Sequence, residues 1–122
     1  IGVRAALPDT QIVAVCGDGS FQMSLMELAT MRQWDLPIKF VIMRNGYLGL
    51  VREYQHHTYH DRYSGVSLDG SPDFEKIADA YGLDYFHLEH NDEMEQRIDE
   101  FLACEHAAMM VCEVYSFDLV KE

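Results

Sequence analysis

The residues best suited to chemistry form two short polar clusters, each placed directly after an apolar run. Gly17–Ser20 (GDGS) follows the run Gln11–Cys16, and Asn45–Tyr47 (NGY) follows the run Ile38–Met43. Glycines let a backbone approach a ligand closely, and the start of a helix offers unpaired N–H groups to an anion. The first cluster therefore predicts contact with a phosphate group.

A carboxylate in the first cluster indicates that a cation accompanies that anion. Asp18 would repel a phosphate unless a divalent ion lay between them, and Mg²⁺ is an oxygen-preferring ion often shared between carboxylates and phosphates. Asn45 follows Asp18 by 27 positions, the length of one helix plus one strand. The chain then returns to the same sheet edge, so we expect Asp18, the Asn45 side-chain oxygen and the Tyr47 carbonyl to ligate one Mg²⁺.

Strands and helices alternate along the chain and would position these clusters. Short apolar runs predict buried strands at 11–16, 38–43, 85–88 and 108–114. Helical spacing of apolar residues predicts one helix from about Phe21 to Trp34, with Trp34 anchored in the core, and a second over Leu48–His57. The polar stretch His57–Gly70 is expected to form a loop.

Capping residues predict two further helices. Ser71 is the expected N-cap of the first, Pro72 its first helical residue and Gly82 its end. Asn91 is the expected N-cap of the second, whose predicted buried face consists of Met94, Ile98, Phe101 and Leu102. The acidic side chains crowded between positions 89 and 105 are expected to form its solvated side.

This alternation predicts an α/β fold, with a parallel sheet and helices on both faces. The length of 122 residues fits a single domain over positions 1–122. The chain starts at Ile1 with what resembles the tail of a helix, so we expect it to be a fragment of a larger, multidomain protein. Ligands of such sheets bind beyond the carboxyl ends of the strands, where the two polar clusters lie.

The two clusters together resemble a known family motif. Gly17-Asp18-Gly19, followed by a helix, a strand and Asn45, resembles the motif of thiamine-diphosphate enzymes that begins with GDG and ends in asparagine. The wider text is similar to the acetolactate synthase branch of that family, at Gly17–Met23 (GDGSFQM), Glu27–Thr30 (ELAT), Leu36-Pro37 and Tyr47–Val51 (YLGLV). The resemblance implies a C-terminal, diphosphate-binding domain.

The resemblance also implies a role for each matching residue. The implied metal ligands are Asp18, Asn45 and Tyr47, and the implied cofactor-binding residues are Gly17, Asp18, Gly19, Ser20, Asn45, Tyr47, Gly49 and Leu50. Tyr54 stands where these synthases often have a tryptophan at the substrate entrance. Arg44 replaces the first of two consecutive asparagines usual in the family, although the matching metal ligand, Asn45, is retained.

The activity implied by the resemblance is that of a thiamine-diphosphate- and Mg²⁺-dependent transferase or lyase, similar to acetolactate synthase. Such an enzyme condenses a two-carbon unit from pyruvate with a 2-oxo acid, as in branched-chain amino-acid biosynthesis. The activating glutamate would come from a pyrimidine-binding domain of the same or a neighbouring subunit. We therefore expect no catalytic residue in this chain, no activity from it alone, and a homo-oligomeric parent enzyme, dimer or tetramer, in which FAD binding stays open.

Other functions compete with this interpretation. The same scaffold serves 2-oxo acid decarboxylases and acyltransferases, which substrate tests would separate. A phospho-acceptor α/β domain would need acidic neighbours for Asp18, and a dinucleotide site would need glycine where Gln22 stands. A non-catalytic partner-binding domain would not explain the spacing of Asp18 and Asn45. His56 and His60 have the spacing of zinc ligands, but no nearby cysteine completes a site.

Composition limits the partners and the compartment. The formal net charge of −12 argues against binding to nucleic acid or an anionic membrane. The three cysteines are odd in number and lack C-x-x-C spacing, which favours a reducing cytoplasm. No apolar stretch has the length of a membrane span, and no signal peptide is visible.

Overall fold

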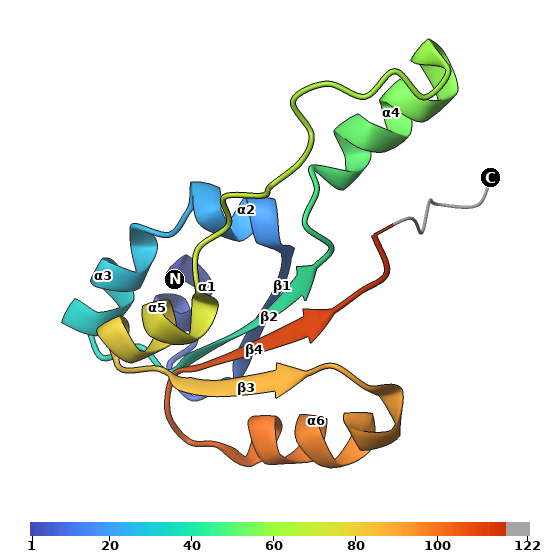
Figure 1. Ribbon diagram of the computed structural model, residues 1–122. Helices are drawn as coiled ribbons and strands as arrows, with labels where there is room; N and C mark the ends of the chain where they lie inside the picture. The colour runs from blue at the N-terminus through green and yellow to red at the C-terminus, as the bar shows by residue number, and fades with distance from the viewer. Residues whose placement is uncertain (117–122) are drawn as a thin grey trace.

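A four-stranded parallel sheet forms the frame of the molecule (Figure 1). The computed structural model describes residues 1–116. The strands are β1 (Ile12–Gly17), β2 (Ile38–Arg44), β3 (Asp84–Leu88) and β4 (Ala108–Glu113), arranged in the order β1-β2-β4-β3. All three strand pairings are parallel, so the predicted fold class is confirmed.

Helices cover both faces of this sheet. They are α1 (Gly2–Ala6), α2 (Asp18–Met23), α3 (Glu27–Gln33), α4 (Gly49–Tyr59), α5 (Phe74–Tyr81) and α6 (Met94–Ala103), the last preceded by the 3₁₀ turn η1 (Asn91–Glu93). The connections from β1 to β2 and from β2 to β3 cross the sheet in one direction and place α2, α3 and α5 on one face. The return from β3 to β4 runs the other way, so crossovers of a single hand place α6 on the opposite face (Figure 1).

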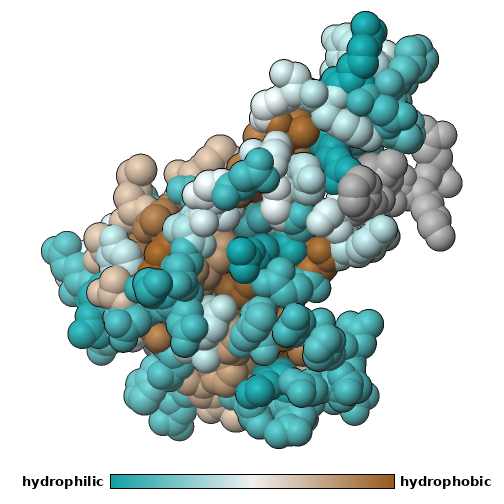
Figure 2. Space-filling view, in the orientation of Figure 1, coloured by the Kyte–Doolittle hydropathy of each residue, from teal (hydrophilic) through white to brown (hydrophobic). Residues whose placement is uncertain are grey.

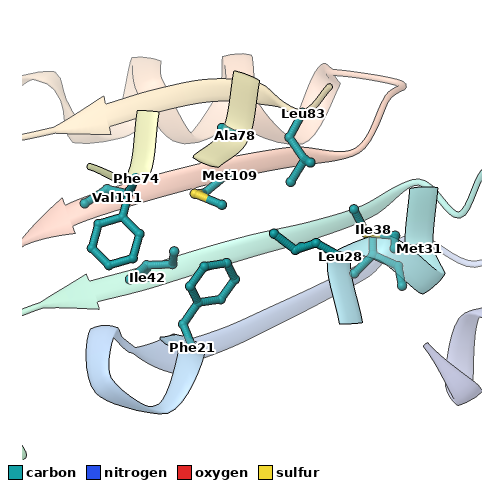
Figure 3. Close-up of a cluster of buried hydrophobic side chains, with 10 residues drawn as sticks. All are labelled: Phe21, Leu28, Met31, Ile38, Ile42, Phe74, Ala78, Leu83, Met109 and Val111. Atoms are coloured by element: carbon teal, nitrogen blue, oxygen red, sulfur yellow. The ribbon is translucent and has the colours of Figure 1, made fainter. Parts of the chain in front are cut away.

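Two apolar clusters pack on the two faces of the sheet. The larger joins α2, α3 and α5 to the strands; its fully buried members include Leu28 and Met31 of α3, Ala78 of α5 and Ile42 of β2 (Figure 3). The smaller joins Phe101 of α6 to β3 and β4. Alternate residues of β4 serve the two clusters, as the two-residue repeat of a strand requires.

The strand register brings the two polar clusters of the sequence to one edge. Gly17, the last residue of β1, pairs with Met43 of β2, so the residues that follow both strands leave the sheet at the same level. The predicted strands are thus confirmed to within one residue at each end. The helix predicted over Leu48–His57 is α4, which extends to Tyr59 and projects away from the sheet (Figure 1).

The single helix predicted from Phe21 to Trp34 is wrong, because the chain forms α2 and α3 separated by a turn at 24–26. The backbone N–H groups of Ser24 and Glu27 donate to carbonyls three residues earlier, at 3.0 Å in both cases, which tightens the chain and redirects it. No glycine or proline lies at this break, so no residue type at positions 24–26 predicts it. Trp34 is 68% exposed and does not anchor the helix in the core.

The caps of two helices also differ from the prediction. Asp73, not Ser71, is the N-cap of α5, and its Oδ1 accepts the backbone N–H of Lys76 at 3.2 Å. Gly82 ends α5 in a left-handed conformation, with φ of +68°, as predicted. Asn91 begins the turn η1 rather than capping α6, whose first turn has no side-chain cap.

Of the four residues predicted to form the buried face of α6, only Phe101 is buried. Met94, Ile98 and Leu102 are 42%, 37% and 39% exposed. These three side chains line an open cavity of about 360 Å³ beside Val13 and Val41, because α6 covers β3 and β4 but not the neighbouring half of this face. Within residues 1–116, no helix is long and apolar enough to span a membrane.

Candidate functional site

A cavity of about 410 Å³ lies beyond the carboxyl ends of β1 and β2. This volume falls within the range of small-molecule sites. The cavity brings together all eight predicted cofactor-binding residues: Gly17, Asp18, Gly19, Ser20, Asn45, Tyr47, Gly49 and Leu50. Its remaining walls are apolar and come from Met23, Met43, Leu48, Val51 and Val114, so the cavity combines a polar floor with apolar sides.

Asp18 lies at the centre of the polar floor and is only 1% exposed. Its Oδ1 accepts the backbone N–H of Gly19 at 3.0 Å, and its Oδ2 accepts the backbone N–H of Gly46 at 2.9 Å. The second bond ties the start of α2 directly to the loop that contains Asn45. The ion pairs of residues 1–116 all use other carboxylates, so this buried charge is balanced only by hydrogen bonds.

Gly46 gives the loop after β2 its shape. Its φ of +73° lies in the left-handed region, which other residues adopt at a cost. This turn points the Gly46 N–H at Asp18, while the Asn45 Oδ1 accepts the backbone N–H of Tyr47 at 2.9 Å. The Asn45 side chain is therefore held in the loop that is hydrogen-bonded to Asp18, and both residues line the same cavity.

The loop after β2 pairs antiparallel with the backbone around Ser67. The Leu48 N–H donates to the Val66 carbonyl and the Leu68 N–H donates to the Gly46 carbonyl, each at 2.9 Å. Leu48 and Leu68 then pack so tightly on Gly19 that an added Cβ at that glycine would lie 2.8 Å and 3.2 Å from their methyl groups. Position 19 therefore favours glycine, because the Leu48 and Leu68 side chains occupy the space that a larger side chain would need.

The other predicted site residues around Asp18 differ in how far they are exposed to solvent. Ser20 is exposed at the rim, and Leu50 on α4 is 80% exposed. Tyr54 lies one turn further along α4, is 58% exposed and packs edge-on against Tyr59, outside the cavity lining. Arg44 points away from the cavity toward β4, with its Nη1 at 3.2 Å from Glu113.

Arg52 is a buried residue near the site that the sequence analysis missed. It is 5% exposed, and its guanidinium lies over the rings of Tyr47 and Tyr63, 4.2 Å and 5.2 Å from their centroids. It also donates to the carbonyl of Ser116. Arginine is usually exposed, and the neighbouring residues Val51 and Glu53 do not predict that Arg52 is buried against Tyr47.

The donor atoms of this site fit a hard divalent cation. A carboxylate offers about four lone-pair positions, and the two backbone bonds leave about two of them available on Asp18. Carboxylate and amide oxygens are ligands that Mg²⁺ accepts, usually together with phosphate oxygens and water. A buried carboxylate without a counter-charge is costly, and a bound cation would remove that cost.

Comparison with known proteins places these motifs in a family context. Residues 1–114 match the family described as thiamine pyrophosphate enzyme, C-terminal TPP binding domain. The chain is 38% identical over 115 residues to an acetolactate synthase of Arthrospira platensis, covering 93% of this chain and 20% of that protein. It is 40% identical over 102 residues to the large subunit of acetolactate synthase isozyme 3 of Escherichia coli K12, covering 84% of this chain and 18% of that protein.

The chain thus spans about a fifth of the length of the curated relatives it matches. The two matches cover 93% and 84% of this chain. The family match over residues 1–114 covers all four strands of the sheet.

Proposed function

The chain belongs to the thiamine pyrophosphate enzymes, as their C-terminal TPP-binding domain, and from this premise we propose that it holds the diphosphate and Mg²⁺ of thiamine diphosphate in an acetolactate synthase-like enzyme. The observation that carries the proposal is the Asp18 carboxylate. It is buried, lacks a counter-charge among the described residues, and is hydrogen-bonded to the loop that presents Asn45. A divalent cation between this carboxylate and a diphosphate would satisfy both charges.

Each residue of the cavity then has a distinct task. The cation is held by the side chains of Asp18 and Asn45 and by the Tyr47 carbonyl. The Arg52 guanidinium packs on the Tyr47 ring and fixes its position. Gly17, Gly19 and Ser20 line the diphosphate end. The Gly19 N–H already donates to Asp18, so its contribution is to orient that carboxylate. Gly49 and Leu50 lie along the cofactor at the start of α4.

Bound thiamine diphosphate supplies the electron sink that decarboxylation of a 2-oxo acid requires. The residues of this chain bind and orient it. Among residues 1–116, Asp18 is the one acidic residue that lines the cavity, so activation of the pyrimidine ring requires another carboxylate. We assign that task to a glutamate on a pyrimidine-binding domain of the same or a neighbouring subunit, in a homo-oligomeric cytoplasmic enzyme. The proposed reaction joins a two-carbon unit from pyruvate to a second 2-oxo acid.

Titration calorimetry of thiamine diphosphate into the parent enzyme tests the site, with Mg²⁺ and then with EDTA. We expect binding that requires Mg²⁺ and that Asp18→Ala abolishes, because this change removes the charged metal ligand. The matched control is Asp79→Ala, which removes an exposed aspartate on α5 and leaves binding unchanged. Equal binding by Asp18→Ala and the parent enzyme would refute the assignment.

The reaction class is tested separately, by the products formed from pyruvate. Acetolactate supports the carboligase assignment, whereas acetaldehyde alone would identify a 2-oxo acid decarboxylase on the same cofactor site. Tyr54 lies on the exposed side of α4 near the cavity, where it would contact the second substrate. Tyr54→Ala is therefore expected to change the preference between 2-oxo acids while Mg²⁺-dependent cofactor binding is retained.

A further inference from the structure

A group of three different metal-ligating side chains lies at the opposite edge of the sheet from the cofactor cavity. Asp84 is the first residue of β3, Cys104 follows the last residue of α6, and His106 lies in the connection from α6 to β4. In the described part of the chain, residues 1–116, this is the one such group whose ligand atoms all lie within 4.8 Å of one another. The histidines of α4 do not form one.

The distances within this group suit a small ion. The Cys104 Sγ lies 3.0 Å from the Asp84 Oδ2, and the His106 Nδ1 lies 3.4 Å from the same oxygen. Metal–ligand bonds of about 2.0–2.3 Å at tetrahedral angles place the ligand atoms roughly 3.3–3.6 Å apart. Both distances to Asp84 therefore lie within about half an ångström of this range, and all three ligand atoms lie within 4.8 Å of one another. The His106 side chain is 82% exposed, so it has room to move toward an ion.

The backbone that carries the three residues is fixed by the sheet. The Asp84 N–H donates to the Ala107 carbonyl at 3.0 Å, and Asp84 pairs with Ala108 in the β3–β4 register. Cys104 is held by a bond of 3.2 Å from its N–H to the Glu100 carbonyl at the end of α6. The side chains thus converge from two rigid elements and one short connection, which is the arrangement that a preformed site requires.

We propose that Asp84, Cys104 and His106 bind one Zn²⁺-type ion, with water as the fourth ligand. Thiolate, imidazole and carboxylate are all zinc ligands, whereas Mg²⁺ and Ca²⁺ take oxygen ligands. Asp84 and an ionised Cys104 together carry two negative charges, which balance the divalent ion. Binding releases the Cys104 thiol proton to solvent, replacing the present S–H bond to Asp84 by two bonds to the metal.

The bound ion would fasten the end of α6 to the start of β3. In Figure 1 this part of the sheet lies where the connection from α6 enters β4. The cofactor cavity lies at the opposite ends of the strands, beyond the carboxyl ends of β1 and β2. Lys39 donates to the Leu102 carbonyl at 2.6 Å, close to Cys104. Burial and the hydrogen bond to Asp84 raise the pKa of the Cys104 thiol, so the thiolate forms when the metal displaces the proton. The site is therefore separate from the Asp18 site.

Cobalt titration of the reduced parent protein, with Mg²⁺ in excess, tests the proposal. Tetrahedral Co²⁺ bound to a thiolate gives a sulfur-to-metal charge-transfer band and intense visible bands, and one equivalent of Zn²⁺ should remove both. We expect Cys104→Ser to abolish the charge-transfer band. His106→Gln should weaken Co²⁺ binding by at least about tenfold, since ligand loss costs no less than loss of an outer-shell partner.

Matched controls separate this site from others. Cys16→Ser removes a free thiol from the opposite face of the sheet and should leave the band intact. Asp18→Ala should also keep it, although that variant loses Mg²⁺-dependent cofactor binding, so the two assignments fail or succeed separately. His106 is exposed, and its replacement does not threaten the fold.

Three results would overturn the proposal. They are the absence of stoichiometric Co²⁺ binding, Co²⁺ binding without a thiolate band, and a band that persists unchanged in Cys104→Ser. A band lost in Cys104→Ser and weakened in His106→Gln, with Cys16→Ser unaffected, supports it.

Discussion

The backbone conformation of Gly46 lets its N–H group donate to Asp18, which links the loop after β2 to the start of α2. Its φ is +73°, and an added Cβ would meet no atom within 4 Å, so replacement by alanine introduces backbone strain without a clash. We expect Gly46→Ala to lower the free energy of unfolding by about 1–2 kcal/mol, the cost of a left-handed alanine. Because the Gly46 N–H orients Asp18, cofactor affinity should also fall several-fold, measurable by calorimetry.

Gly70→Ala is the matched control for this change. An added Cβ there also meets open space, and Gly70 is not among the glycines with positive φ. Urea unfolding of both variants separates the two cases. Equal stability of Gly46→Ala and the parent protein would show that the turn rearranges without cost and that Asp18 does not depend on it.

The positions of Asp18 and Asn45 were predictable because each directly follows a strand, and parallel strands bring such residues to one edge. Their environment was not predictable to the same degree. The Asp18–Gly46 bond depends on the turn after β2, and the burial of Arg52 depends on the rings of Tyr47 and Tyr63, 16 positions apart in the chain. Contacts of this kind arise from tertiary packing, which a local pattern does not encode.

At the scale of elements, α6 is held to the sheet mainly by one side chain. Phe101 is 1% exposed and packs edge-on against Phe86 of β3, with ring centroids 5.6 Å apart. We expect Phe101→Ala to destabilise the protein by about 3–5 kcal/mol, as deletion of a buried ring does. Leu102→Ala should cost less than about 1 kcal/mol, because that side chain is 39% exposed.

Thermal unfolding of these two neighbouring variants gives the comparison directly. Both residues belong to the buried face of α6 predicted from the sequence, so a difference in stability between the two variants distinguishes the structure from that prediction. Comparable losses for both would mean that another part of the parent protein covers Leu102.

The elements themselves were predicted unevenly. The strands are predicted correctly because their short apolar runs are flanked by Gly17, Pro37 or polar turns, and these signals are local. The break at 24–26 was missed because Leu25 and Leu28 continue the helical spacing across it. The N-cap of α5 was placed two residues early, since both Ser71 and Asp73 are capping types and only the observed bond to Lys76 decides between them.

At the scale of the whole molecule, the net charge of −12 opposes compactness. The hydrophilic side chains gather over the outer side of α6 and the far end of α4 (Figure 2). Raising the ionic strength from about 0.01 M to about 0.15 M shortens the screening length from about 30 Å to about 8 Å. We expect the melting temperature to rise over this range, measured by circular dichroism with sodium chloride.

A charge-reversed variant provides the control for this effect. Glu95 and Asp99 are exposed on α6 and take part in none of the ion pairs of residues 1–116. The double variant Glu95→Lys, Asp99→Lys lowers the negative charge and should respond less to salt. An identical response of both proteins would attribute the change to general salt effects and not to self-repulsion.

Strand β1 borders the sheet, with a strand neighbour on one side only among the described residues, and its Val13 and Val15 are 39% and 67% exposed. The unpaired backbone groups of an edge strand can form hydrogen bonds with a strand of another molecule. Here the repulsion between negatively charged molecules opposes such pairing. That protection disappears near the isoelectric point, at pH of about 4.7. Acid elution or crystallisation near that pH therefore favours edge-to-edge precipitation of the chain, and alkaline buffers preserve it in solution.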